Sequence, residues 1–98
     1  MLSFEWDPDK ARKNIENHKV SFDEASTTFK DTKSITIYDP LHSLDEDRFI
    51  IIGISCKNRL LITVHTDISN KIRLISSRKA KKDERKHYEE NAKRSGIA

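Results

Sequence analysis

Four stretches of the chain, residues 34–38, 48–56, 59–66 and 71–77, have the pattern of β-strands, and hydrophobic and polar residues alternate most clearly in residues 34–38. A period of two is typical of β-strands, because successive side chains of a strand point to opposite faces of a sheet. Short polar segments join the last three stretches, so we expect an antiparallel meander. A short extended lead-in, in which Phe4 and Trp6 alternate with Glu5, precedes them. The pattern therefore predicts one four-stranded antiparallel sheet.

Three further stretches carry apolar residues at helical spacing. Residues 8–18 follow Asp7, a favoured N-cap, and open with a proline. Residues 22–30 follow Ser21 in a Ser-x-x-Glu capping box. Residues 80–94 form a thin apolar stripe among lysines and arginines. We therefore expect an α+β fold with two short N-terminal helices, the four-stranded sheet and a C-terminal helix.

Register follows from keeping the apolar residues of neighbouring strands on one face. The residues that this pairing brings together are Ile50, Ile52, Ile54, Leu60, Ile62, Val64, Ile72 and Leu74. We expect them to form the core face, covered by the two N-terminal helices. The opposite face would carry Phe49, Ile51, Gly53, Leu61, Thr63, His65, Arg73 and Ile75. If Ile72 lies beside Thr66, His65 lies directly across from Arg73 on this second face.

The composition allows only a small core, because hydrophobic residues make up 35% of the chain and charged residues 36%. Its 98 residues suffice for a single domain over residues 1–98. No run of about eighteen apolar residues is present, and the first residues lack the basic start and apolar run of a signal peptide. The single Cys56 excludes an internal disulfide. We expect a cytoplasmic protein that does not associate with a membrane.

The net charge of +3 is unevenly distributed along the chain. Residues 1–70 carry 9 Lys and Arg against 12 Asp and Glu, a net charge of −3. Residues 71–98 carry 10 against 4, a net charge of +6. The basic C-terminal part suits a polyanion such as nucleic acid, or an acidic protein partner. The alternative is that the last helix is simply a lysine-rich, solvated surface helix.

The residue types exclude several kinds of site. The four histidines show no metal-ligand spacing, one cysteine cannot build a thiolate site, and two glycines cannot form a phosphate-binding loop. We therefore expect neither a metal nor another cofactor. What remains is a cluster of arginines and lysines with one strand histidine, His65, on one side of the sheet.

Such a cluster suits cleavage of RNA without a metal ion, because the substrate supplies its own nucleophile, the 2′-hydroxyl. A histidine can move protons near neutral pH. Arginines can hold phosphate oxygens and stabilise the charge of the transition state. The alternative is a basic face that binds RNA or a partner protein without catalysis.

Taken in order, the motifs of this chain resemble the BrnT family of toxins from type II toxin–antitoxin systems. They span residues 4–89 and comprise Phe4-Glu5-Trp6-Asp7, Lys10, Asn14, His18, Val20-Ser21-Phe22-Asp23-Glu24-Ala25, Phe29, Asp39, His42, Arg48, Gly53, His65-Thr66, Ile72-Arg73, Ile75-Ser76-Ser77-Arg78-Lys79-Ala80, Glu84-Arg85 and Tyr88-Glu89. The resemblance implies a RelE-like fold and an endoribonuclease toxin that arrests growth. The chain departs from the family at Lys81, where a threonine often caps the last helix, so the start of that helix is less secure.

The resemblance also implies the partners. They are an RNA substrate and a BrnA-like antitoxin with a ribbon-helix-helix region, in a complex of two toxins and two antitoxins. Operator DNA would be contacted only through the antitoxin. Two rivals of the same fold stay open: a non-enzymatic module that binds RNA or protein, and a toxin that poisons a topoisomerase.

Site residues follow from the same resemblance. The expected catalytic residues are His65 as general acid or base, with Arg48, Arg73 and Arg78 handling the phosphate. The basic charge of the C-terminal part, rather than the resemblance, adds Lys79, Lys81 and Lys82 as the expected RNA-binding residues. The alternative for His65 is a hydrogen bond that locks the sheet edge, and the alternative for Arg73 and Arg78 is contact with acidic groups of the antitoxin.

Overall fold

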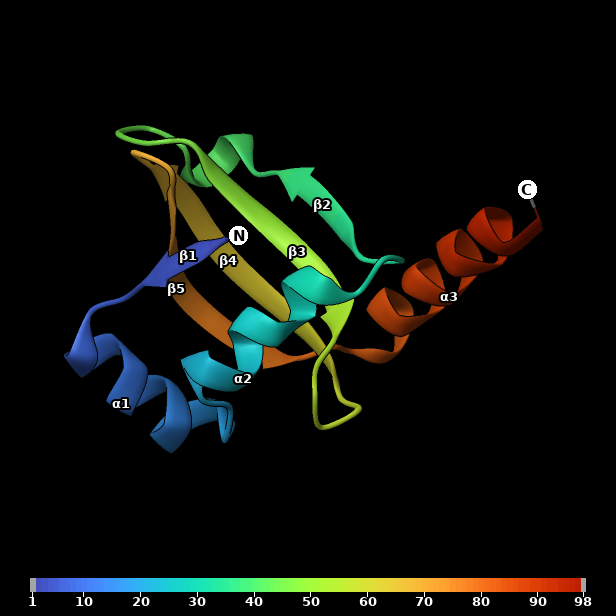
Figure 1. The fold of residues 1–98 in the computed structure, drawn as a ribbon, viewed down its shortest axis with the longest axis horizontal. Helices are drawn as coiled ribbons and strands as arrows, with labels where there is room; N and C mark the ends of the chain where they lie inside the picture. The colour runs from blue at the N-terminus through green and yellow to red at the C-terminus, as the bar shows by residue number, and fades with distance from the viewer. Residues whose placement is uncertain (1, 98) are drawn as a thin grey trace.

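A computed structural model describes residues 2–97 as a five-stranded mixed sheet with helices packed on it (Figure 1). The strands are β1 (Ser3–Glu5), β2 (Ile35–Tyr38), β3 (Arg48–Ile54), β4 (Leu60–Ile68) and β5 (Lys71–Lys79). The α-helices are α1 (Pro8–His18), α2 (Phe22–Ser26) and α3 (Lys82–Ile97), and two 3₁₀ turns are η1 (Thr27–Lys30) and η2 (Pro40–His42). The expected α+β class is confirmed.

The sheet has the strand order β1-β5-β4-β3-β2, and β1 is the strand that the sequence pattern missed. The other strands pair antiparallel, but β1 pairs parallel with β5, with Ser3 opposite Lys71 and Glu5 opposite Arg73. The expectation of a four-stranded, purely antiparallel sheet is therefore wrong. Three residues are too few for alternation to distinguish a strand from an extended lead-in.

Local sequence determines where α1 begins and ends. The Asp7 side chain accepts a hydrogen bond from the Lys10 N–H at 3.0 Å, and Pro8 occupies the first turn. Lys19 ends the helix in the left-handed conformation, with a φ of 59°. α1 therefore spans the predicted residues 8–18.

The second expected helix, residues 22–30, is divided into α2 and η1. Ser21 caps α2 by accepting a hydrogen bond from the Glu24 N–H at 3.0 Å. The hydroxyls of Thr27 and Thr28 then donate to backbone carbonyls three residues earlier. β-Branched residues that bond to their own backbone weaken an α-helix, and the chain tightens into the 3₁₀ turn at this point.

Pairing between β2, β3 and β4 follows the alternation of apolar residues. Ile37 lies opposite Ile50, which lies opposite Val64. One rung further along, Ile52 lies opposite Ile62. The register between β3 and β4 is thus the one that the apolar pattern predicts.

A β-bulge at Ile75 shifts the register between β4 and β5. As a result, His65 lies opposite Leu74 and Thr66 lies opposite Arg73. A bulge sets two residues of one strand against one residue of its partner, so it changes which residues share a face. The expected pairing of His65 with Arg73 is therefore wrong, and their side chains lie on opposite faces of the sheet.

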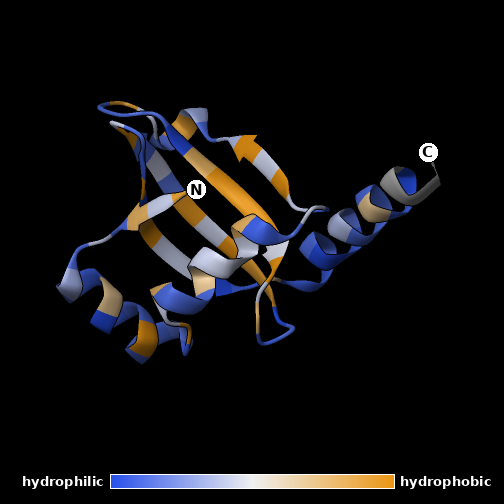
Figure 2. Cartoon of the chain, viewed as in Figure 1, coloured by the Kyte–Doolittle hydropathy of each residue, from blue (hydrophilic) through white to orange (hydrophobic). Residues whose placement is uncertain are grey.

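Different helices cover the two faces. The α1 face, which α1, α2 and η1 cover, carries Phe49, Ile51, Gly53, Leu61, Thr63, His65 and Leu74. The α3 face, on one end of which α3 packs, carries Arg48, Ile50, Ile52, Ile62, Val64, Thr66, Arg73 and Arg78. The N-terminal helices thus cover the face opposite to the one expected. β3 is hydrophobic along most of its length (Figure 2), so alternation alone could not identify the face that these helices cover.

The main core lies on the α1 face. Its buried residues are Val20, Phe22, Ala25, Leu61 and Leu74. η1 approaches β3 so closely that a Cβ on Gly53 would lie 3.0 Å from the Thr28 carbonyl oxygen. A side chain at this position would therefore push η1 away from the sheet.

Asn14 joins α1 to β5 inside this core, at 5% exposure. Its amide donates to the carbonyls of Val20 and Ser77, each at 2.8 Å, and its side-chain oxygen accepts from the Ser77 N–H at 2.9 Å. A buried amide with these partners is fully compensated for its loss of water. It fixes α1 against the strand that also carries Arg73.

α3 begins two residues later than expected, at Lys82, and extends beyond the end of the sheet (Figure 1). Tyr88 anchors it, because the ring is 8% exposed and packs with Ile52, Leu60 and Ile62. The Tyr88 hydroxyl donates to the Asp31 carboxylate at 2.5 Å. Burial raises the pKa of Tyr88 to about 12, so the hydroxyl keeps its proton for this bond.

Candidate functional site

A row of polar residues crosses four strands on the α3 face. Glu5 of β1 lies opposite Arg73 of β5, Arg73 opposite Thr66 of β4, and Thr66 opposite Arg48 of β3. Neighbouring strands are about 4.8 Å apart, so the four Cα atoms span about 15 Å. We call these four residues the polar row. The fold thus brings together two of the arginines expected from the sequence, Arg48 and Arg73.

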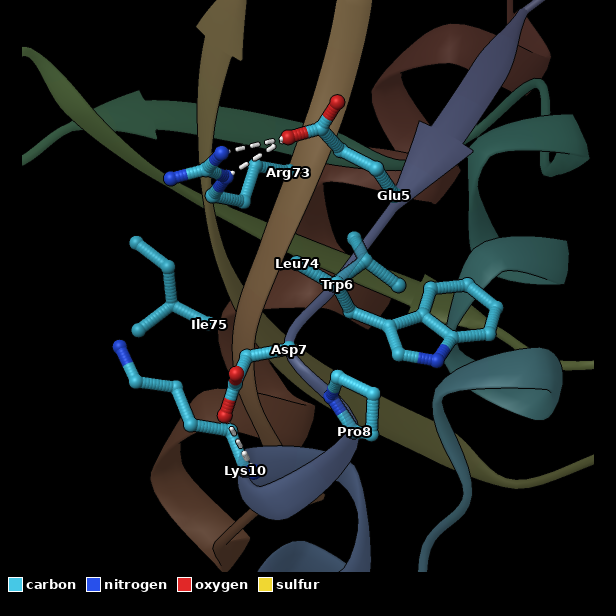
Figure 3. A pocket seen from close by; sticks show the side chains of 8 residues that line it. All are labelled: Glu5, Trp6, Asp7, Pro8, Lys10, Arg73, Leu74 and Ile75. Atoms are coloured by element: carbon cyan, nitrogen blue, oxygen red, sulfur yellow. Dashed lines mark hydrogen bonds and ion pairs between the residues drawn. The ribbon is translucent and has the colours of Figure 1, made fainter.

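Arg73 and Glu5 form an ion pair at the exposed edge of the sheet (Figure 3). The Arg73 Nε and Nη2 atoms lie 2.8 and 2.7 Å from Glu5 Oε2. The two side chains are 49% and 32% exposed, so solvent screens the pair and it adds little to stability. Only Nε and Nη2 face Glu5, and the remaining N–H donors of the guanidinium are open to an oxyanion.

The loop between β2 and β3 borders the other end of the polar row. Thr66 is buried and donates its hydroxyl to the Asp47 carbonyl at 2.7 Å. The Arg48 Nε atom lies 3.7 Å from Glu46 Oε1, too far for a hydrogen bond. Among the residues that the structure describes, this buried N–H has no hydrogen-bond partner. A buried donor of this kind calls for an acceptor, which a bound oxyanion would supply.

A pocket of about 310 Å³ adjoins the β1 end of the polar row (Figure 3). It lies between β1, the first turn of α1 and β5. The residues that line it are Glu5, Trp6, Asp7, Pro8, Lys10, Arg73, Leu74 and Ile75. The pocket therefore combines two carboxylates, two cations and apolar walls.

Arg78 shares the α3 face but lies five residues from Arg73 along β5, about 16 Å at strand spacing. Its Nη1 and Nη2 atoms each donate to the Glu84 carboxylate at 2.8 Å. This pair and the hydrogen bond from the Lys81 N–H lower the pKa of Glu84 to about 2. Glu84 thus secures the start of α3, which the side chain of Lys81 cannot cap.

The expected RNA-binding lysines surround the junction of β5 and α3. They are Lys79, Lys81 and Lys82, and all three are exposed. They form a basic surface at the opposite end of β5 from the polar row. The fold therefore does not place Arg78 and these lysines beside Arg73, but distributes them along the same strand and the helix that follows.

His65 lies on the α1 face, away from the polar row. It is 4% exposed, and its ring lies between Phe29 and Phe49, with centroid distances of 5.0 and 5.6 Å. Its Nδ1 atom lies 3.3 Å from the Asp67 carboxylate, but neither ring nitrogen makes a hydrogen bond. Burial lowers the pKa of His65, and Asp67 opposes part of that shift. The fold therefore separates the expected acid–base residue from Arg73.

Sequence reasoning did not find Glu5 as a member of the site. The alternation of Phe4, Glu5 and Trp6 indicates an extended segment, but nothing in three residues identifies its partner strand. Glu5 reaches Arg73 only because β1 pairs in parallel with β5. The sequence would have had to show that the first residues form a strand and that this strand pairs in parallel with β5, and it contains no such pattern.

Within residues 2–97, no three His, Cys, Asp or Glu side chains are grouped so that they could hold a metal ion. In that same range, no helix has both the length and the apolar character needed to cross a membrane.

The fold and the polar row define a small α+β protein with an arginine-bearing sheet face that suits phosphate groups. The family model described as the ribonuclease toxin BrnT of type II toxin–antitoxin systems matches residues 6–84. The chain therefore belongs to the BrnT family of ribonuclease toxins, as the motifs of the sequence predicted. Membership implies an RNA substrate and an antitoxin partner.

A solved structure supports the fold. The chain superposes on the 1.1 Å crystal structure of the Brucella abortus ribonuclease toxin BrnT with a TM-score of 0.61. The two sequences are 19% identical, and the match covers 84% of this chain and 100% of the Brucella chain. At this identity the likeness concerns the fold alone. No curated protein sequence matches the chain.

Proposed function

We propose that this chain is an endoribonuclease toxin that cleaves RNA without a metal ion. The 2′-hydroxyl of the substrate attacks the adjacent phosphorus, and the bond to the 5′-oxygen of the next nucleotide breaks. The products are a 2′,3′-cyclic phosphate and a 5′-hydroxyl. The observation that carries the proposal is the polar row, which sets one carboxylate and two arginines on one face of the sheet.

Arg73 and Arg48 are the phosphate-binding residues in this proposal. Their strands flank β4, so their Cα atoms are about 10 Å apart, within reach of one phosphate for two long side chains. The donors are the Arg48 guanidinium, which is ion-paired with Glu46 but makes no hydrogen bond through Nε among the described residues, and the N–H groups of Arg73 that do not face Glu5. Each contact that strengthens in the transition state contributes about 3 kcal/mol.

Glu5 is the general base in this proposal. Its Oε2 atom is held by Arg73, and among the described residues its Oε1 atom has no hydrogen-bond partner. Oε1 accepts the proton of the 2′-hydroxyl, and the leaving 5′-oxygen takes a proton from water. The ion pair aligns the base with the arginine that holds the phosphate, which is the geometry that proton transfer needs.

His65 as general acid or base stays a prediction of the sequence, and Glu5 takes that role in the proposal. The burial of His65 between two phenylalanine rings favours a packing role instead. Arg78 is proposed to bind a more distant phosphate through N–H groups that do not face Glu84. Lys79, Lys81 and Lys82 are proposed to continue this path for the RNA backbone.

The antitoxin is proposed to be BrnA-like, with a ribbon-helix-helix region that alone contacts operator DNA. Two toxins and two antitoxins would form the complex. The family membership supports a protein inhibitor, and the mass of the complex after co-expression with the antitoxin gene tests the stoichiometry. A complex of another composition would contradict this part of the proposal.

The test of cleavage uses the purified chain, a structured RNA and EDTA. We expect cutting to continue in EDTA and to leave cyclic phosphates and 5′-hydroxyls. Activity that disappears in EDTA and returns with added metal contradicts the proposal, and so do 5′-phosphate ends. RNA that is bound but stays intact, without growth arrest on expression, would favour the non-enzymatic module. DNA breaks with intact RNA would favour a topoisomerase poison.

A further inference from the structure

The pocket beside Arg73 contains chemistry that the cleavage proposal does not use. Lys10 and Asp7 line it on the side toward the first turn of α1, and Trp6 borders it with its ring turned toward Phe22 of the core (Figure 3). We propose that this pocket binds a guanine base of the RNA next to the phosphate that is cut. This inference rests on the proposed function, because the phosphate bound at Arg73 brings the neighbouring base to the pocket.

The pocket has the size and the walls that a base needs. Its volume of about 310 Å³ lies at the small end of the range for ligand sites. The Ile75 side chain and Pro8 supply its apolar surface, whereas Leu74 and Trp6, which also border it, have side chains that pack into the core (Figure 3). Single-stranded RNA is recognised by splaying out one base and contacting its face and its polar edge together. An apolar wall beside charged groups meets both requirements.

The charged groups in the pocket have unused capacity. The Asp7 Oδ2 atom accepts the Lys10 N–H at 3.0 Å, whereas Oδ1 has no partner among the described residues. The Lys10 ammonium forms no ion pair with any residue that the structure describes, and its side chain is exposed. A carboxylate that can accept and a cation that can donate therefore line one small space.

Guanine matches this combination. It presents two neighbouring donors, N1–H and the N2 amino group, which a single carboxylate can accept. It also presents two neighbouring acceptors, O6 and N7, which a lysine or arginine can bind. Asp7 would take the donor edge and Lys10 the acceptor edge. Arg73 and Glu5, at the rim, would remain with the phosphate and the 2′-hydroxyl.

The other bases match less well. Adenine offers a single amino donor and no carbonyl oxygen, and uracil offers one ring N–H between two carbonyls. Cytosine offers an amino donor beside the acceptors N3 and O2 but has no ring N–H, so it cannot donate two neighbouring hydrogen bonds to one carboxylate. Each lost bidentate contact would lower the affinity for that base by roughly tenfold. The pocket therefore predicts cutting beside guanosine.

Trp6 allows binding to be measured without cleavage. It is the single tryptophan of the chain and lines the pocket. Its fluorescence therefore reports a base that enters, whereas a ligand bound at α3 leaves it unchanged. The probes are guanosine, adenosine, cytidine and uridine 3′-monophosphates, added separately to the full chain.

Two substitutions remove the charges and keep the fold. Asp7→Asn removes the carboxylate, but asparagine caps a helix as well as aspartate. Lys10→Met removes the ammonium from an exposed side chain. The matched controls are Asp9→Asn and Lys13→Met on the same helix, because both residues are exposed and neither lines the pocket. Thermal unfolding of all four variants verifies that α1 is intact.

We expect guanosine 3′-monophosphate to change Trp6 fluorescence and to bind about tenfold more tightly than the other three nucleotides. Asp7→Asn should abolish this preference, Lys10→Met should weaken binding, and the controls should bind like the parent chain. Mapped RNA ends should show guanosine beside the cut in the parent chain and relaxed choice in Asp7→Asn.

The two proposals fail in different ways. Cutting with equal frequency beside all four bases, or no fluorescence response to guanosine 3′-monophosphate, overturns the guanine pocket and leaves the ribonuclease proposal standing. A guanine preference that Asp7→Asn does not change overturns the pocket as well. Selective binding of guanosine 3′-monophosphate by a chain that cuts no RNA supports the pocket and overturns the ribonuclease proposal.

Discussion

The two faces of the sheet are built from the same strands but differ in what covers them. On the α1 face, helices and η1 exclude water from Leu61 and Leu74, and His65 is packed between aromatic rings. On the α3 face, one helix covers one end, and Arg73 remains half-exposed at the other. The environment of a residue therefore depends on its face. His65 lies in the core of the α1 face, whereas Arg48 and Arg73 belong to the polar row on the α3 face.

One residue sets this difference. Without the bulge at Ile75, the side chains of His65 and Arg73 would be neighbours on one face. With the bulge, Arg73 joins Thr66 and Arg48, and His65 joins Leu74. Bulges often redirect a side chain beside a functional site.

The largest effect that we expect concerns packing on the α1 face. Leu61→Ala removes a side chain with no exposed surface, and it should lower the free energy of unfolding by about 3 kcal/mol through lost burial and a cavity. Ile50→Ala, at a half-buried position on the α3 face, should cost about 1 kcal/mol. Urea unfolding measures both. Equal losses would contradict the contrast between the faces.

The second prediction contrasts the catalytic potential of the faces. Arg73→Ala should lower kcat/KM for RNA cleavage about a hundredfold, because it removes a phosphate contact and releases Glu5. His65→Phe keeps an aromatic ring between Phe29 and Phe49 and should cleave at close to the parent rate. Circular dichroism shows whether both variants fold. A large loss of kcat/KM in a folded His65→Phe variant would show that His65 takes part in catalysis.

The third prediction uses pH. Burial holds the pKa of His65 below its ordinary 6.5, so the unfolded chain binds a proton more readily than the folded chain. Its contribution to stability is therefore present above about pH 6.5 and is lost as the pH falls below that value. Urea unfolding at about pH 7.5 and pH 5.5 measures the loss.

His65→Phe cannot be protonated, so this part of the pH dependence should disappear in that variant. The exposed His18→Gln is the matched control and should keep the pH dependence of the parent chain. An unchanged pH dependence in His65→Phe would show that His65 does not titrate on unfolding.

The smallest effect concerns the start of α3. Glu84→Gln loses its ion pair with Arg78 and should lower the free energy of unfolding by about 1 kcal/mol at neutral pH. The pKa of Glu84 falls from 4.5 to about 2 in the folded chain, so this contribution is present above pH 4.5 and is lost toward pH 2. Unfolding of Glu84→Gln and the exposed control Glu89→Gln across this range measures it. A difference that persists at pH 2 would contradict the assignment.

Much of the fold could be predicted from local sequence. Asp7 and Ser21 cap helices where their patterns indicate, and the matching of apolar residues between β3 and β4 gives the register of this pair. These features depend on residues near one another in sequence or on one long repeating pattern. Family motifs added Arg48 and Arg73, which the fold brings to one row.

The remainder depends on contacts that local sequence does not encode. Both faces of β3 are apolar, so only tertiary packing decides which face α1 and α2 cover. Isoleucine is common in regular strands, so the residue type at position 75 does not predict a bulge. The partner of Glu5 lies 68 residues away, beyond the reach of any periodicity.

That separation has a consequence for synthesis of the chain. Glu5 is made early, but Arg73 is added only when about three-quarters of the chain is made, and β5 must dock between β1 and β4. Contacts between distant residues form late, after the loops between them have closed. A nascent or truncated chain that ends before β5 therefore lacks both the polar row and its pocket. The order of the strands delays the appearance of the site until the whole sheet exists.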